Sequence, residues 1–547
     1  MKMDTSAPRR RRIGGLASGR RRTLFLAALL ALVAAAALSG IAGASGQSEK
    51  VLTWGQQTDP GSLWNATDFN GLDGAPIMSL INQGLVALTP DNKLVPNLAS
   101  SWKAVSPTKY VYTVRSGVKF SDGNTLTAKD VAYSIGVQKN PKTGSDENNF
   151  FANIKAVHAS GNKVTVVLSH PDALWQYIPA HEAGYVYEAK SLSAHLTGYG
   201  TPSALPIGTG PYKVQEYVAN SHVTLVRNPY YWGQKPSYDK IVFNFIPDPQ
   251  TRYLAMRSGQ IDGTFDVPGG DLKTWRASSN IHVTTFPADG FFGLTLDMSQ
   301  SNPPFNNVHV RKAIAYAVDR VGINNAVFGN TGTIANTLDD PVTLVGVLPA
   351  AEVKKSYAAI PSYSYDIAKA KAEMAKSPVP QGFTTTLNVA APCANCVAIS
   401  QAIAGTLKQI GITVNLNMMP GPPRFQYILA HGPNLGIQLI GNSADVPNPI
   451  ELPWLYFKSD QAVKGGNNSS NYRDPATDKI INQGLAAIDP AVAARTAIKA
   501  ETAAADVAAM VPIVWIQTIA ATQGKLHLTN PGAFFMNTLW INNLKQG

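Results

Sequence analysis

The stretch from Gly208 to Asp262 carries the most specific pattern in this chain. It begins with a Gly-Thr-Gly-Pro-Tyr turn that leads into a strand, and an Arg-Asn-Pro-Tyr corner follows at 227–230. A Tyr-Trp-Gly triplet comes next, and further on a helix ends in Gly-Gln-Ile-Asp at 259–262. Because glycine and proline mark the points where a chain turns, this order of turn, strand, corner, aromatic anchor and helix strongly restricts the fold.

Three other segments carry comparably specific patterns, namely N-Q-G-L at 82–85, L-V-P-N-L-A-S-S-W at 94–102 and V-R-K-A-I-A-Y-A-V-D-R at 310–320. Together with the 208–262 stretch, and in this order, they resemble the family 5 extracytoplasmic solute-binding proteins. These are the oligopeptide, dipeptide and nickel receptors of ABC importers. The resemblance extends over nearly all of residues 51–547.

The resemblance implies an α/β protein with the two-lobed periplasmic-binding-protein fold, type II-like, in the large form with an additional inserted domain. A chain of this length also exceeds what one hydrophobic core supports. We expect lobe I to be formed by 45–88, 208–288 and 516–547, lobe II by 289–515, and the inserted domain by 89–207.

The resemblance further implies a receptor that catalyses no reaction. It would capture a ligand in the cleft between its lobes, close by a hinge motion and present the ligand to a membrane permease. The chain contains no Walker A sequence, so a separate cytoplasmic ATPase would supply the energy. We expect a monomer without a cofactor.

Residues 1–44 read as a signal peptide. Two arginine groups, at 9–12 and 20–22, precede an uncharged stretch from Leu24 to Ala44 that ends in a small-x-small cleavage pattern. That stretch has the length of a membrane span, so an uncleaved anchor is the alternative. Ile41 stands where a lipoprotein would carry its acylated cysteine. We expect an exported, extracytoplasmic protein, with the choice between Sec and twin-arginine export left open.

The basic charge of the chain comes mainly from this leader. The whole chain has a formal net charge of +11, and residues 1–44 contribute +7 of it through Lys2, seven arginines and Asp4. The remaining surface is only mildly basic, which gives no indication of nucleic-acid binding.

Periodicity predicts several elements. Strands are expected at 51–54, 110–114 and 511–514, and a helix with a capping box from Thr127 to Asp130 is expected from about Ala128. A strand at 386–389, a helix at 397–410 and a strand at 412–416 predict a parallel βαβ unit. A second helix, with Asn307 as N-cap, is indicated by helical spacing of Val310, Ala313, Ile314, Ala317, Val318 and Val321.

Cys393 and Cys396 are the only two cysteines, and they lie between the strand and the helix of the βαβ unit. A Cys-x-x-Cys pair at a helix N-terminus is also the arrangement of thioredoxin-type redox centres. Because the chain carries an export signal and the flanking residues do not resemble an oxidoreductase, we expect a structural disulfide.

Asp445, in the segment A-D-V-P-N-P at 444–449, is the leading candidate for ligand recognition. Peptide receptors of the family carry a similar segment, whose aspartate receives the α-ammonium group of the ligand. A buried ammonium needs such an anionic partner. The alternative is that Asp445 caps a turn before Pro447. The segment 436–441 offers no cation for a peptide carboxylate, and the nearest upstream is Arg424.

Four tryptophans are candidates for lining the cleft, where they could contact peptide side chains or sugar rings: Trp54, Trp64, Trp175 and Trp454. Hydrophobic packing is the alternative for each of them.

Several other classes of function lack their motifs. The nine histidines show no zinc-ligand spacing, no Gly-x-Ser-x-Gly elbow occurs, and Gly208-Thr209-Gly210 lacks the third glycine of a dinucleotide loop. The resemblance to the family implies peptides as the leading ligand class. Oligosaccharides, opine-like conjugates and nickel chelates are alternatives within the family, and a secreted hydrolase or a ligand sensor is an alternative outside it.

Overall fold

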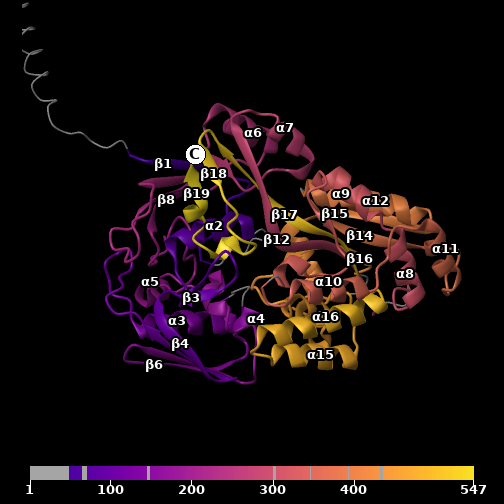
Figure 1. Cartoon of the computed structure of the whole chain (residues 1–547), viewed down its shortest axis with the longest axis horizontal. Helices are drawn as coiled ribbons and strands as arrows, with labels where there is room; N and C mark the ends of the chain where they lie inside the picture. Colours follow the sequence, from indigo (N-terminus) through magenta and orange to yellow (C-terminus); the bar gives the residue numbers. More distant parts are fainter. Residues whose placement is uncertain are drawn as a thin grey trace, which may run out of the picture. The chain divides into compact units, whose positions relative to one another are not determined.

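An eleven-stranded mixed sheet forms the centre of the computed structural model (Figure 1). The structure describes residues 49–64, 71–143, 148–299, 304–344, 346–391, 393–431 and 435–547. The predicted signal peptide lies outside these residues, and 50–547 form one unit, which is described by itself.

The strand order in this sheet is β15-β14-β16-β12-β17-β11-β1-β10-β9-β8, with β13 also paired to β17. The strands are β1 (Val51–Gln56), β8 (Tyr212–Val218), β9 (His222–Arg227), β10 (Lys240–Phe245), β11 (Gly263–Thr264), β12 (Ile281–Leu296), β13 (Thr333–Ile334), β14 (Phe383–Ala391), β15 (Ile412–Pro420), β16 (Ile437–Ser443) and β17 (Met510–Gln523). We call the part around β1 and β8–β11 lobe I, and the part around β14–β16 lobe II.

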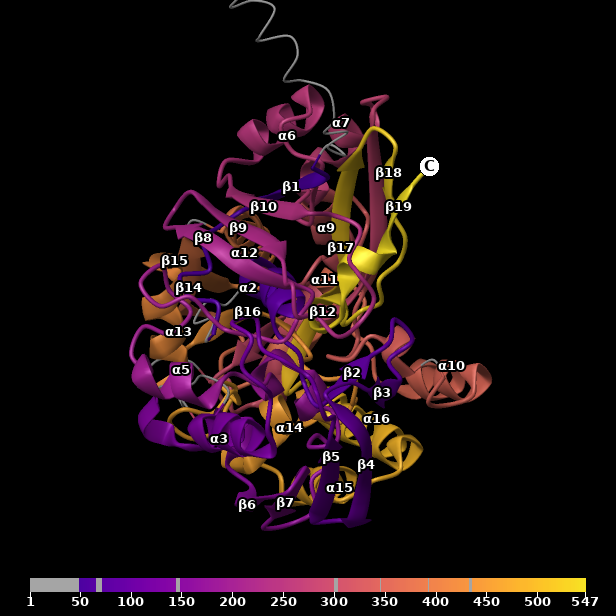
Figure 2. The same cartoon turned by 90° about the vertical axis from the view of Figure 1, so that its left-hand side faces the viewer.

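The long strands β12 and β17 belong to both lobes. They pair antiparallel along nearly their whole length, and both views show them side by side (Figures 1 and 2). Their register shifts between Pro287 and Gly290, opposite Gln517 and Ile516. Such a bulge bends a strand locally, so the continuous ladder bends at this point. The lobe boundaries expected at 288/289 and 515/516 lie next to the register shift and stay predictions.

A separate four-stranded sheet, in the order β4-β5-β7-β6, lies within the expected inserted domain. It comprises β4 (Ala99–Ser106), β5 (Lys109–Val114), β6 (Ile154–Ser160) and β7 (Lys163–Leu168), drawn in indigo and purple in Figure 1. Its helix α3 (Ala128–Lys139) begins as predicted, because the carboxylate of Asp130 accepts a hydrogen bond of 2.9 Å from the N–H of Thr127.

The predicted βαβ unit is confirmed. Strands β14 and β15 are parallel neighbours, and helix α12 (Ala394–Lys408) connects them. Gly411 ends the connection with φ +83°, a conformation that favours glycine. Cys393 and Cys396, at the start of α12, are joined by a disulfide.

The predicted helix through Val321 is wrong in its second half. Helix α8 (Val308–Ala317) ends before Val318, and a new helix, α9 (Arg320–Phe328), begins with Asp319 as its N-cap. Arg320 explains the break, because its buried guanidinium donates to the carbonyls of Ala315 and Pro512 at 3.0 and 2.7 Å. Buried donors must be paired, so this side chain fixes the corner. Val321 is consequently 58% exposed.

The C-terminal tail packs into lobe I. Trp540 is fully buried against Trp54, Phe265 and Phe243, and its ring N–H donates to the carbonyl of Pro76 at 2.9 Å. The tail also forms the small sheet of β18 (Leu526–Leu528) and β19 (Leu544–Gln546), drawn in yellow in both views (Figures 1 and 2).

The remaining helices and short strands surround these sheets. They are α2 (Gly71–Ile81), β2 (Val86–Leu88), β3 (Leu94–Pro96), α4 (Asn148–Phe151), α5 (Ala189–Ala194), α6 (Pro249–Ser258), α7 (Leu272–Arg276), α10 (Ala350–Ala359), α11 (Ile367–Ala375), α13 (Gly421–Leu429), α14 (Glu451–Phe457), α15 (Pro475–Leu485) and α16 (Pro490–Asp506). Among the described residues, no helix combines the length and the apolar character that a membrane span requires.

The broken helix leads to a prediction about stability. Val310 on α8 is fully buried and Val321 on α9 is exposed. We expect Val310→Ala to lower the free energy of unfolding by about 2 kcal/mol, because buried methyl groups are lost. Val321→Ala should change it by less than about 0.5 kcal/mol. Urea denaturation of both variants measures this, and equal losses would support one continuous helix instead.

Candidate functional site

Asp445 follows β16 by two residues, near the register shift in β12. Strand β16 pairs with β12, and the N–H of Ala444 donates to the carbonyl of Asp289 at 3.0 Å. The N–H groups of Asp445 and Val446 both donate to the carboxylate of Glu451, at 3.1 and 3.0 Å. The turn is therefore capped by Glu451 at the start of α14. No backbone N–H of the described residues donates to the carboxylate of Asp445, whose side chain instead forms a hydrogen bond with the carboxyl group of Glu451.

The segment of His181 and Glu182 lies near Asp445, since the charge of Asp445 acts on the pKa of both side chains. His181 and Glu182 precede Tyr185, and Glu182 begins the short 3-10 helix Glu182–Gly184. The ring of Phe150 joins this segment to α14, since it lies 6.0 Å from His181 and 6.2 Å from Trp454. The side-chain amide of Asn448 donates to the carbonyl of Ala173 at 3.2 Å. The described residues thus form direct contacts between the 148–182 region and lobe II.

Acidic groups from both sides converge at Asp445. Burial, followed by the charge of Asp445, raises the pKa of Glu182 to about 7. The same two causes raise the pKa of the fully buried Glu451 well above its usual value. Burial lowers the pKa of His181, so its ring stays neutral near pH 7.

No basic side chain among the described residues compensates these carboxyl groups. Within the described ranges, no Lys or Arg forms an ion pair with Asp445, Glu182 or Glu451. The Oε2 atom of Glu182 is buried and accepts no hydrogen bond from the described part of the chain. Because uncompensated buried charge is costly, this arrangement favours a cation supplied from outside.

The tryptophans divide into two groups. Trp454, partly exposed on α14, and Trp175, 1% exposed, belong to the same apolar cluster, which spans the inserted domain and lobe II. Trp54 and Trp64 are buried in the lobe I cluster instead, Trp54 against Trp540 and Trp64 against Tyr199. Trp454 shares helix α14 with Glu451, whose carboxylate accepts from the N–H groups of Asp445 and Val446.

Arg424 is buried on α13 and does not pair with Asp445. Its guanidinium donates to the carbonyls of Asn388, on β14, and Leu439, on β16. Burial lowers its pKa to about 10. These contacts indicate that Arg424 ties α13 to the sheet of lobe II.

Two residues of this site were missed from the sequence. Glu451 follows Pro449 by two positions, and its capping of the 445–446 turn is a contact between near neighbours that the local pattern could have suggested. Glu182 lies more than 260 positions before Asp445, and nothing in the local sequence indicates their proximity.

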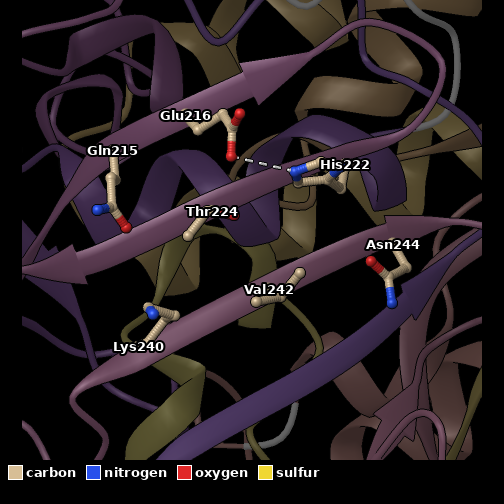
Figure 3. A pocket seen from close by; sticks show the side chains of 7 residues that line it. All are labelled: Gln215, Glu216, His222, Thr224, Lys240, Val242 and Asn244. Carbon is tan, nitrogen blue, oxygen red and sulfur yellow. Dashed lines mark hydrogen bonds and ion pairs between the residues drawn. The ribbon is translucent and has the colours of Figure 1, made fainter. Parts of the chain in front are cut away.

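An open depression lies on strands β8–β10 of lobe I. It has a volume of about 610 Å³ and is lined by Gln215, Glu216, His222, Thr224, Lys240, Val242 and Asn244 (Figure 3). Glu216 and His222 form an ion pair of 3.4 Å across neighbouring strands. The other side chains stand apart on the sheet, so this face offers no convergent set of polar groups.

Comparison with known proteins identifies the family of this chain. A family model described as "Bacterial extracellular solute-binding proteins, family 5 Middle" matches residues 93–464. A Brucella ovis protein, provisionally named as an ABC transporter peptide-binding protein, is 28% identical over 421 residues, which cover 73% of this chain and 75% of that protein.

Two solved structures share the fold. The Agrobacterium tumefaciens binding protein AgaA, in complex with agropinic acid, superposes with a TM-score of 0.78 at 25% identity, covering 91% of this chain and 99% of AgaA. The Helicobacter pylori protein DppA, in complex with the peptide STSA, gives a TM-score of 0.78 at 21% identity, covering 92% and 100% of the two chains.

The family model covers more than half of the chain, and the two-lobed α/β architecture agrees with it. This chain therefore belongs to the bacterial extracellular solute-binding proteins of family 5.

Proposed function

We propose that this protein is a receptor for peptides with a free α-amine, which it binds between its lobes and delivers to the permease of an ABC importer. The observation that carries the proposal is the set of uncompensated carboxyl groups at Asp445, Glu182 and Glu451. The ammonium group of a peptide supplies the missing positive charge. Trp454 and Phe150 offer apolar surface beside it.

Closure of the lobes follows because these carboxyl groups belong to different parts of the fold. Glu182 lies in the region before lobe I resumes at 208, whereas Asp445 lies in lobe II, and only a closed cleft holds both around one cation. A ligand ammonium therefore binds the closed form more tightly than the open one, and only such a difference in affinity shifts the equilibrium. The hinge is the register shift in β12 and β17.

An opine-like ligand is the second candidate. AgaA, at 25% identity, was solved with agropinic acid. No arginine among the described residues pairs with Asp445, so none is positioned there to receive the carboxylate of a peptide. A ligand whose acid group differs from that of a peptide would fit this lack of an arginine. A nickel chelate is a weaker candidate, because no group of three His, Cys, Asp or Glu among the described residues is arranged to hold a metal ion.

The remaining assignments belong to the same proposal. The signal peptide at 1–44 directs export, the mature protein acts outside the cytoplasmic membrane without a lipid anchor, and a separate ATPase drives import. The receptor acts as a monomer and catalyses no reaction.

The ammonium site predicts a specific loss of binding. A pool of short free-amine peptides should raise the melting temperature of residues 45–547, because a ligand at about 100 times its Kd contributes roughly 2.7 kcal/mol. The same pool after N-acetylation should cause no shift, and Asp445→Asn should abolish the shift with free amines. Asp474→Asn is the matched control, because asparagine preserves its role as the N-cap of α15. A shift with both pools, or an unchanged shift in Asp445→Asn, would contradict the assignment.

Glu182 predicts a pH dependence of the ligand-free protein. Its raised pKa means that between about pH 4.5 and 7 the folded state holds a proton that the unfolded chain has released. Stability therefore falls as pH rises through this window, and Glu182→Gln removes that part of the loss. We expect the variant to gain about 1 kcal/mol relative to the wild type between pH 5 and 7.5, since partial exposure reduces the full effect. Parallel stability profiles from urea denaturation would contradict this.

A further inference from the structure

A second group of acids lies at the hinge. Asp289 belongs to β12, Asp339 and Asp340 to the loop after β13, and Glu501 to α16. All four side chains are buried, with Asp289 and Asp339 only 3% and 2% exposed. Glu182 and Glu451 do not belong to this group, and the side chains of its four acids have no role in the site described above.

The hydrogen bonds of this group are incomplete. Glu501 accepts from the N–H groups of Leu338 and Asp339 at 3.0 and 3.4 Å, and Asp340 accepts from the N–H of Val342 at 2.9 Å. In contrast, Oδ1 of Asp289 and Oδ2 of Asp339 are buried and receive no hydrogen bond from any described residue. Two unpartnered carboxylate oxygens in one group indicate a missing donor.

No base of the described chain supplies that donor. None of the four acids forms an ion pair with a Lys, Arg or His of the described residues. Arg320 lines the same small cavity as Glu501, of about 80 Å³, but its guanidinium donates to the carbonyls of Pro512, Ala315 and Tyr363. Tyr357 faces the group and donates its hydroxyl to the carbonyl of Asp339 at 3.2 Å.

The acid group adjoins Asp445. The carbonyl of Asp289 accepts the N–H of Ala444, the residue before Asp445. Asp289 has φ +45° and lies within the register shift of the hinge strand. A non-glycine residue in this conformation is uncommon and is often found at functional sites. A cation held here would therefore be close to a ligand ammonium at Asp445.

We propose that Asp289, Asp339, Asp340 and Glu501 form a subsite for a cationic side chain of the ligand, adjacent to its α-amine. The receptor then prefers peptides whose first residue is arginine or lysine. This inference rests on the proposed function and narrows its substrate class. A guanidinium group suits the site because it presents several donors in a plane and pairs with more than one carboxylate.

An organic cation fits better than a metal ion. The described residues contain no group of three His, Cys, Asp or Glu side chains in an arrangement that could hold a metal. The donors of a guanidinium are spread over a larger area, so they can reach carboxylates that do not converge on a single point.

Protonation explains how the ligand-free protein accommodates four buried acids close together. Burial, followed by the charge of Asp340, raises the pKa of Asp289 well above its usual value. Burial is also the first cause for Asp339, followed by the charges of Glu501, Asp289 and Asp340, and it raises the pKa of Glu501 to about 8. The free protein thus holds protons here. A bound cation favours the ionised carboxylates, so these protons pass to the buffer and affinity rises with pH.

The test compares two tripeptides of nearly equal shape, Arg-Ala-Ala and citrulline-Ala-Ala, because citrulline replaces the guanidinium by a neutral urea group. Calorimetric titration at pH 7.5 should show at least tenfold tighter binding of the arginine peptide. Asp289→Asn and Asp339→Asn should both remove this preference, and Asp339→Asn should leave the affinity for the citrulline peptide within about threefold. Asparagine tolerates the backbone conformation at 289. Asp474→Asn should keep the full preference.

Proton release gives a second readout. Titrations in two buffers of different ionisation enthalpy should show that the arginine peptide releases more protons than the citrulline peptide, and that Asp339→Asn reduces the difference. Equal affinities of the two peptides would overturn the cationic subsite while leaving the peptide receptor intact. Failure of both peptides to bind would overturn the receptor assignment and the subsite together.

Discussion

The shared ladder of β12 and β17 is the constraint on which the rest of the structure depends. These strands run through both lobes, and their register shift at 287–290 is the place where the continuous sheet can bend. Asp289 lies within the shift, and its carbonyl holds the segment that carries Asp445. The proposed ligand site is therefore built on the hinge itself. Neutralising charge at that point changes the relative free energies of the open and closed forms directly.

The chemistry of the cleft follows from an excess of buried acid. Carboxyl groups gather around Asp445 and beside it at Asp289, and no base among the described residues pairs with them. The free protein accommodates these groups by holding protons, since burial raises their pKa values. In the proposed complex, a dicationic ligand replaces the protons and provides the donors that the unpartnered oxygens lack. In this proposal, ligand binding, proton release and closure of the lobes are therefore coupled.

Local sequence patterns predicted many helices and strands correctly. They failed where contacts between residues far apart in the sequence determine the structure. The βαβ unit, the Asn307 cap and the start of α3 follow from short-range chemistry, and the structure agrees. The break after α8 depends on carbonyls of Tyr363 and Pro512 that Arg320 meets only in the folded chain. Trp54 illustrates the same limit, because its partners Phe265 and Trp540 are far away in sequence. At the candidate site, the local segment around Asp445 predicted that residue. Glu182 and the hinge acids could not be predicted, because only the folded chain brings them together.

The central claim is that a free-amine ligand closes the lobes around Asp445. Spin labels at Val105→Cys on β4 and Val321→Cys on α9 would report it, because both positions are exposed and belong to different lobes or domains. The native disulfide leaves no other free thiol to react. Pulsed electron paramagnetic resonance should show a shorter and narrower distance distribution with Arg-Ala-Ala, and no change with its N-acetylated form. Binding of the free-amine peptide with an unchanged distribution would contradict the account.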